Sequence, residues 1–139
     1  MPHTLMYSSV AAFAMSDSEV DALLSRSREL NAAQEITGLL VYIRLDYHRA
    51  AFLQVLEGPH DAVEQTYGRI ERDELHKDLT VLRRSSLEAA RFRGWSMKFA
   101  TLDETGLRDA GDDAGNSDPL ALLRETETME RVIVAVGRH

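Results

Sequence analysis

A glutamine stands in the middle of the apolar run FLQVLEGP, residues 52–59. The run reads as a strand that enters a core, where an unpaired primary amide costs about 1–3 kcal/mol. The Gln54 amide has two donors and two acceptor lone pairs that need partners when it is buried. The sequence therefore calls for a hydrogen-bonding partner of Gln54.

Four further residues stand out on segments that should be apolar. Tyr7 lies on an expected first strand, Asn31 ends an expected first helix, and Trp95 and Met97 lie on an expected fifth strand. Each alone has an ordinary explanation as a strand aromatic, a helix end or a core residue, and Gln54 would also suit an edge strand facing solvent. If the first and third strands are central neighbours, however, Tyr7 and Gln54 meet on one face, and the first helix brings Asn31 over it.

Other chemistries have little support in the sequence. The chain has no cysteine, no G-x-S-x-G elbow and no glycine-rich phosphate loop, which excludes thiolate metal sites and disulfides and gives no sign of an enzyme. The five histidines show no metal-binding spacing such as H-E-x-x-H, and we expect no metal site among His3, His48, His60, His76 and His139.

Composition indicates one globular domain. The 139 residues suit a single core, with 44% hydrophobic and 28% charged residues. A net charge of −7 without a basic stripe argues against nucleic-acid binding. No signal peptide is present, and no apolar run reaches the roughly 20 residues that span a bilayer. We expect a cytoplasmic protein that does not enter a membrane.

The pattern of apolar residues predicts an α+β fold. Ser16 and Glu19 form a capping box at the start of the first helix, and Pro59 opens the second. The order β-α-β-β-α-β-β is that of a ferredoxin-like fold, with both helices on one face of an antiparallel or mixed sheet. The expected strands cover 3–9, 36–43, 50–58, 79–90 and 94–102, and the expected helices cover 16–34 and 59–75.

The C-terminal part of the chain divides into two segments. Residues 103–117 are rich in Asp and Gly and read as a linker. Residues 118–139 read as a helix from Pro119, although VIVAV, residues 132–136, equally suits a strand. This last segment either caps the exposed sheet face or joins a dimer.

Five stretches together resemble a BLUF domain, a flavin-binding blue-light sensor. They are LMYSS, LLSRSRELNAAQEITGLLVY, FLQVLEGP, VEQTYGRIERDELH and RFRGWSMKF, in the family's order within residues 4–100. The resemblance implies a flavin-binding domain over residues 1–102. It implies that the cofactor is FAD, bound without a covalent link. It assigns cofactor contacts to Tyr7, Leu23, Arg28, Asn31, Gln54, Arg69, Ile70, Asp73 and His76.

The resemblance also implies a mechanism. Tyr7 would hydrogen-bond Gln54, which contacts the flavin, and Trp95 and Met97 would compete for the place beside the glutamine. Light would drive an electron and a proton from Tyr7 through Gln54, and the rearranged amide would shift the absorption to longer wavelength. The signal would leave along the fifth strand. Since roughly 39 residues are too few for an effector domain, output would go to an unknown downstream protein or to a homo-oligomer.

Three features depart from the family pattern. Leu75 stands where an arginine normally helps to hold the cofactor, Leu30 stands where a polar residue is frequent, and the 43–51 hairpin is longer than usual. A second interpretation is therefore a BLUF-like interaction module that has lost flavin binding. A third is a small ferredoxin-like hydrolase, although LMYSSVAAF, residues 5–13, supplies no phosphate-binding loop.

Overall fold

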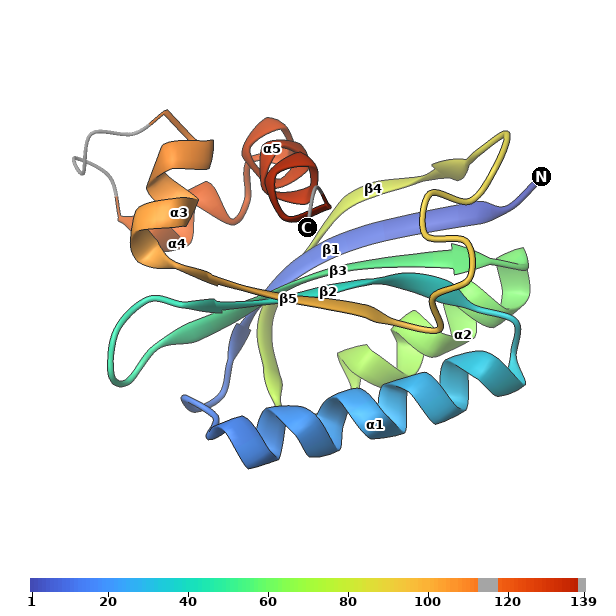
Figure 1. Cartoon of the computed structure of the whole chain (residues 1–139), viewed down its shortest axis with the longest axis horizontal. Coiled ribbons are helices and arrows are strands. Elements are labelled where there is room, and N and C mark those ends of the chain that lie inside the picture. Colours follow the sequence, from blue (N-terminus) through green and yellow to red (C-terminus); the bar gives the residue numbers. More distant parts are fainter. Residues whose placement is uncertain (113–117, 138–139) are drawn as a thin grey trace.

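Five strands form one mixed sheet in the computed structural model, which describes residues 1–112 and 118–137 (Figure 1). The strand order is β4-β1-β3-β2-β5, and only β2 and β5 run parallel. The expected α+β, ferredoxin-like arrangement is confirmed, with β1 next to the central strand β3. The strands are β1 His3–Ala11, β2 Thr37–Arg44, β3 Ala50–Gly58, β4 His76–Ser86 and β5 Lys98–Asp103.

Two helices cover one face of the sheet, as the sequence predicts. They are α1, Asp17–Ala33, and α2, His60–Glu71, and both lie below the sheet in Figure 1. The expected capping box is present, because the Ser16 side chain accepts from the Glu19 backbone and the Glu19 side chain accepts from the Ser16 backbone. The helices pack on a core that includes Leu5, Tyr42 and Leu56.

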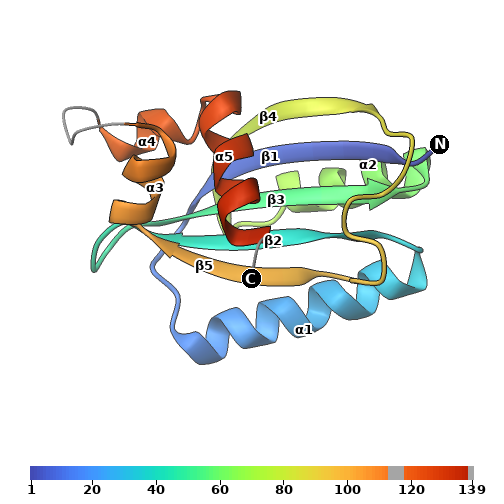
Figure 2. The ribbon, with the colours of Figure 1, turned by 45° about the horizontal axis from the view of Figure 1, so that its top comes forward.

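The C-terminal helices lie on the opposite face. They are α3 Glu104–Ala110, α4 Pro119–Leu122 and α5 Thr126–Gly137, and Figure 2 shows α5 crossing over β1, β3 and β2. Met129 and Val132 are fully buried in the second core cluster. The helix expected from Pro119 is therefore two helices, VIVAV is helical, and α5 covers the sheet within its own chain.

The segment expected to be a linker contains a helix. Asp103 caps α3 by accepting from Gly106 N at 2.8 Å, and Leu107 is fully buried. The many Asp and Gly residues read as loop signals, but one aspartate is a helix cap and one leucine anchors the helix in the core. Residues 113–117 of the expected linker, and 138–139 at the chain end, lie outside the described residues.

The fifth strand begins later than expected, so Trp95 and Met97 lie in the segment before it. Pairing of β2 with β5 starts at Leu39 opposite Lys98. The carbonyls of Ser96 and Met97 accept instead from side chains of α1, and Gly94 has a φ of +86°, which favours glycine. The β2–β5 ladder therefore begins only after Met97, although the Trp95 carbonyl still accepts from Gly38 N at 3.2 Å.

The long hairpin between β2 and β3 has its own local hydrogen bonds. Asp46 accepts from the backbone N–H groups of His48 and Arg49 at 2.8 and 2.7 Å, and also from Arg49 Nε at 2.7 Å. Leu45 points into the core, whereas Tyr47 is fully exposed. The hairpin thus closes on itself, and β2 and β3 pair without a register shift.

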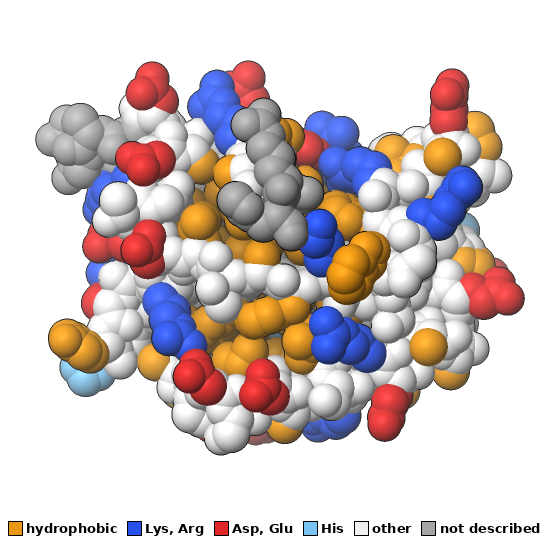
Figure 3. Space-filling view, in the orientation of Figure 1, with side chains coloured by type: hydrophobic (Ala, Val, Ile, Leu, Met, Phe, Trp, Pro, Cys, Tyr) orange, Lys and Arg blue, Asp and Glu red, His pale blue; other side chains and the backbone are white. Residues whose placement is uncertain are grey.

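The surface carries charges of both signs. On the face seen in Figure 3, Lys and Arg side chains alternate with Asp and Glu, while hydrophobic side chains gather between β5 and α1. Among the described residues, no helix combines the length and the apolar character needed to cross a membrane.

Candidate functional site

Tyr7 and Gln54 are direct neighbours across the β1–β3 pair. The Tyr7 hydroxyl donates to Gln54 Oε1, and both side chains are buried, with exposures of 0% and 5%. Tyr7 is therefore the hydrogen-bonding partner of the acceptor oxygen of Gln54, which the sequence predicted must have a partner.

The Tyr7 phenol is held in its neutral form. Burial raises its pKa far above the ordinary tyrosine value, and the nearby Tyr67 and Asp73 raise it further. The Tyr67 ring packs against Tyr7 with centroids 5.4 Å apart. Tyr7 consequently keeps its proton on Oη near neutral pH.

The donor end of Gln54 has only a weak partner. Its Nε2 donates to Met97 Sδ at 3.7 Å, and a thioether is a poor acceptor. Since the same side chain also lines a pocket, the amide N–H groups are available to a ligand that offers a better acceptor.

Side chains of α1 hold the segment that places Met97 beside Gln54. Asn31 Nδ2 donates to Ser96 O at 2.9 Å, and Arg28 Nε donates to Met97 O at 3.0 Å. Met97 is fully buried, while Trp95 is 50% exposed with Lys98 Nζ 5.7 Å from its ring centroid. The structure thus places Met97 beside the glutamine and Trp95 outside.

An open pocket lies between α1 and α2. Two predicted residues do not line it: Tyr7 lies behind Gln54, and the Arg28 guanidinium is bonded to the Met97 carbonyl. The other predicted contacts do line it, namely Leu23, Asn31, Gln54, Arg69, Ile70, Asp73 and His76.

His76 lines the pocket as a neutral side chain. Its Nδ1 is 2.8 Å from Ser9 Oγ, and its ring packs against Phe52 with centroids 4.8 Å apart. Burial lowers the pKa of His76, although Asp73 partly opposes this. His76 therefore adds polarity without adding charge near neutral pH.

The pocket suits a flat aromatic ligand with one polar edge. Leu23 and Ile70 supply apolar surface from the two helices, and Asn31 and Gln54 supply amides. Arg69, which also donates to Thr66 Oγ1 at 3.1 Å, brings a cation to the rim. An isoalloxazine ring has this combination of apolar faces and hydrogen-bonding edge, so the residues present fit a flavin.

A comparison with protein families matches this site. The model named BLUF, described as sensors of blue-light using FAD, covers residues 3–98. The chain belongs to the BLUF family. The matched range contains both helices that line the pocket and the segment that carries Met97, so the pocket lies within the part of the chain that matches a family of blue-light sensors using FAD.

Known BLUF relatives differ in how much of their length this chain spans. Photoactivated adenylate cyclase subunit beta of Euglena gracilis is 35% identical over 99 residues, 70% of this chain but 11% of the relative. BlrB, a BLUF protein solved in its dark state, is 25% identical with a TM-score of 0.66, over 93% of this chain and 96% of that one. BlsA in its photo-activated state shares the fold, with 24% identity and a TM-score of 0.75 over 98% of this chain and 94% of BlsA.

Several residues that line the BLUF pocket were not predicted. On α1, a step of three, four or seven residues from Leu23 leads to the missed positions, because such residues share a helix face. On α2, Thr66 lies four residues before Ile70, and on β2, Leu40 pairs with Gln54. Helical spacing and strand pairing would have found all five missed residues, namely Arg26, Ser27, Leu30, Leu40 and Thr66.

Leu75 lies at the turn between α2 and β4 of the BLUF domain. Its N–H donates to Asp73 Oδ1 at 2.9 Å, and its carbonyl accepts from Ala12 N at 2.9 Å. Its side chain is partly buried and does not line the described pocket, whereas the adjacent His76 does. The position to which the resemblance assigns an arginine is thus occupied by a leucine whose side chain lies outside the described pocket.

Proposed function

We propose that this BLUF protein binds FAD non-covalently between α1 and α2 and that light rearranges the hydrogen bonds of Gln54. One observation carries the proposal: a buried amide is bonded to a buried phenol at one end and faces the pocket with weakly bound donors at the other. The family description favours FAD over FMN.

The chain's own residues would act as a two-state relay. A bound flavin supplies absorption of blue light and an excited state that accepts an electron. Tyr7 holds the proton that moves, and Gln54 Oε1 is positioned to take it. Once the amide has exchanged its donor and acceptor ends, Met97 Sδ no longer faces an N–H donor, so the Met97 contact weakens.

The altered contact would be passed on through the segment before β5. Met97 is joined to Lys98 at the start of that strand, and Asp103 at the strand end caps α3. We propose a downstream protein as the receiver, or a change in a homo-oligomer. The adenylate cyclase activity stated in the names of the Euglena gracilis relatives is theirs, and a cytoplasmic location stays a prediction.

The first test is the visible spectrum of the purified protein. We expect flavin bands that move to longer wavelength under blue light and return in the dark, and FAD in the extract of the denatured protein. FMN in the extract would correct the cofactor, and bands that do not move would contradict the relay. A protein that is colourless and stays colourless after incubation with FAD would support the second interpretation, an interaction module without flavin. Leu75 is the residue that suggests this interpretation.

Replacing Leu75 by arginine is expected to raise the affinity for FAD about tenfold, because a guanidinium beside the pocket forms charge-assisted hydrogen bonds with phosphate. Riboflavin has no phosphate, so its affinity should stay the same. Fluorescence titration of the flavin-free protein measures both constants, and Leu75→Gln is the uncharged control. An equal gain for riboflavin would contradict the phosphate contact.

A further inference from the structure

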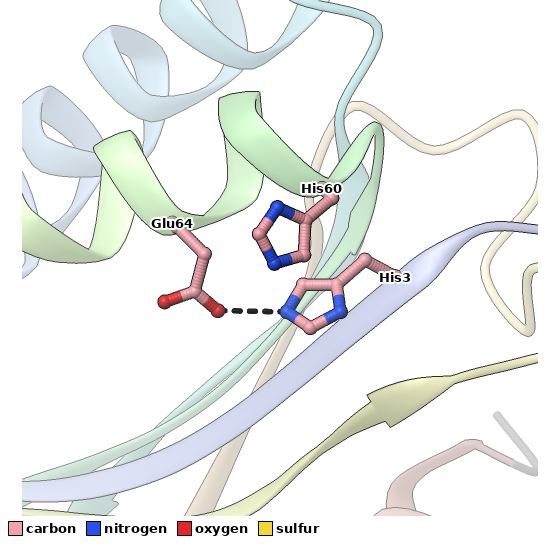
Figure 4. A group of neighbouring side chains, drawn as sticks. All are labelled: His3, His60 and Glu64. Carbon is pink, nitrogen blue, oxygen red and sulfur yellow. Dashed lines mark hydrogen bonds and ion pairs between the residues drawn. The ribbon is translucent and has the colours of Figure 1, made fainter.

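Three potential metal ligands meet where β1 begins and α2 begins. They are His3 from the strand and His60 and Glu64 from the helix (Figure 4). One ligand atom from each lies within 4.8 Å of the other two. His60 and Glu64 are four residues apart and so share a helix face, while His3 comes from 57 residues earlier in the chain.

The side chains already point toward one another. His3 Nε2 is 2.7 Å from Glu64 Oε2, and the His3 and His60 ring centroids are 4.5 Å apart. Figure 4 shows the His60 ring turned toward the gap between the other two side chains. His60 Nδ1 is 3.0 Å from Asp61 Oδ1, which leaves Nε2 for a ligand.

We propose that His3, His60 and Glu64 bind one divalent transition-metal ion, for which Zn²⁺ is the reference. Two imidazoles and one carboxylate are a ligand set that zinc and related first-row ions accept, with water as a fourth ligand. Ligand atoms around tetrahedral zinc lie about 3.3 Å apart. His60 must therefore move closer, while His3 Nε2 and Glu64 Oε2, now 2.7 Å apart, must separate slightly. The His60 side chain is 67% exposed and stands at the first position of α2, so it is free to make this adjustment.

Neighbouring groups would support the ligands. Asp61 fixes the ring nitrogen of His60 that does not bind the ion, as carboxylates do behind metal-binding histidines. Arg84 Nε donates to Glu64 Oε2 at 3.0 Å, and a carboxylate has enough lone pairs to accept this bond and bind a metal. Burial raises the pKa of Glu64, but hydrogen bonds from His3 and Arg84 outweigh it and hold the pKa below its usual range.

The proposed ion would be separate from the flavin. None of the three ligands lines the pocket between α1 and α2. His3 pairs with Gly58, four residues beyond Gln54 on β3. An ion here would join the first residue of β1 to the first turns of α2 and so fasten one wall of the flavin pocket to the sheet.

Calorimetric titration of the flavin-loaded, tag-free protein with Zn²⁺ tests the proposal. We expect one ion per chain, and a loss of affinity of at least about tenfold in both His60→Gln and Glu64→Gln. His48→Gln is the matched control, because it removes an exposed imidazole from the β2–β3 hairpin, and it should leave the affinity unchanged. Zinc should also raise the melting temperature of the natural protein and of His48→Gln but not of His60→Gln.

Two results would overturn the proposal. One is the absence of saturable binding of Zn²⁺ to the natural protein. The other is binding that His60→Gln leaves intact. Because the His60 side chain is exposed, its replacement should not unfold the protein, so a loss of zinc binding in His60→Gln reports on the ligand itself. The flavin absorption of each variant checks that the fold is retained.

Discussion

Gln54→Leu is expected to abolish the light-induced shift while leaving the flavin bound. Leucine has nearly the volume of glutamine but no donor or acceptor, so the relay between Tyr7 and the pocket is cut. The Tyr7 hydroxyl also loses its partner in a fully buried position, which should lower the free energy of unfolding by about 1–3 kcal/mol. Spectra before and after blue light, together with the flavin content, measure both parts.

Two tyrosine variants sharpen this experiment. Tyr7→Phe removes the phenol that donates to Gln54 and should abolish the stable shift as well. Tyr67→Phe is the matched control, because its ring packs on Tyr7 while the Tyr7–Gln54 bond stays intact, and it should keep the shift. A reversible shift of normal size in Gln54→Leu or Tyr7→Phe would contradict the assigned relay.

Glu57→Gln is expected to destabilise the protein by about 2–3 kcal/mol, because a buried charged acceptor of two backbone donors is lost. Glu57 is fully buried, and its two oxygens accept from Arg91 N at 3.1 Å and Phe92 N at 3.0 Å. Arg91 Nε lies 3.6 Å from the same carboxylate. An amide has one acceptor oxygen, so one of the two N–H groups would face an NH₂ donor.

Denaturant unfolding with an equal excess of FAD measures this effect. The exposed Glu74→Gln makes the same chemical change on the surface and should alter the free energy of unfolding by less than about 0.5 kcal/mol. Because Glu57 fixes the segment that leads to Met97, Glu57→Gln should also change the lifetime of the shifted spectrum. Equal stability of Glu57→Gln and the natural protein would show that the hydrogen bonds of Glu57 to Arg91 and Phe92 do not contribute to the free energy of unfolding.

The sequence predicted best what local patterns encode. The capping box at Ser16 predicted the start of α1, and the apolar run around Gln54 predicted β3. The position of Tyr7 on a neighbouring strand followed from the expected strand order. Family resemblance assigned a cofactor contact to Arg28, which stays a prediction; the structure adds a bond from its guanidinium to the Met97 carbonyl, which the sequence did not indicate. Residue type alone does not tell which partner a long side chain selects.

The other features that the sequence did not predict also depend on contacts between residues far apart in the chain. β5 starts only after Met97, because side chains of α1 take the carbonyls of the preceding residues. The helix α3 depends on a distant core that receives Leu107. The cluster of His3 with Glu64 joins two segments 61 residues apart, which no local spacing indicates.

The strand β5 lies at the edge of the sheet, which affects how easily it can move. An edge strand has hydrogen bonds along one side only, here to β2, so sliding it lengthwise breaks half as many bonds as sliding an interior strand. Its six residues span about 20 Å, because an extended chain advances about 3.3 Å per residue. In the proposed mechanism, β5 would therefore carry a displacement of Met97, on the side of α1 and α2, to the first turn of α3 on the opposite side of the sheet.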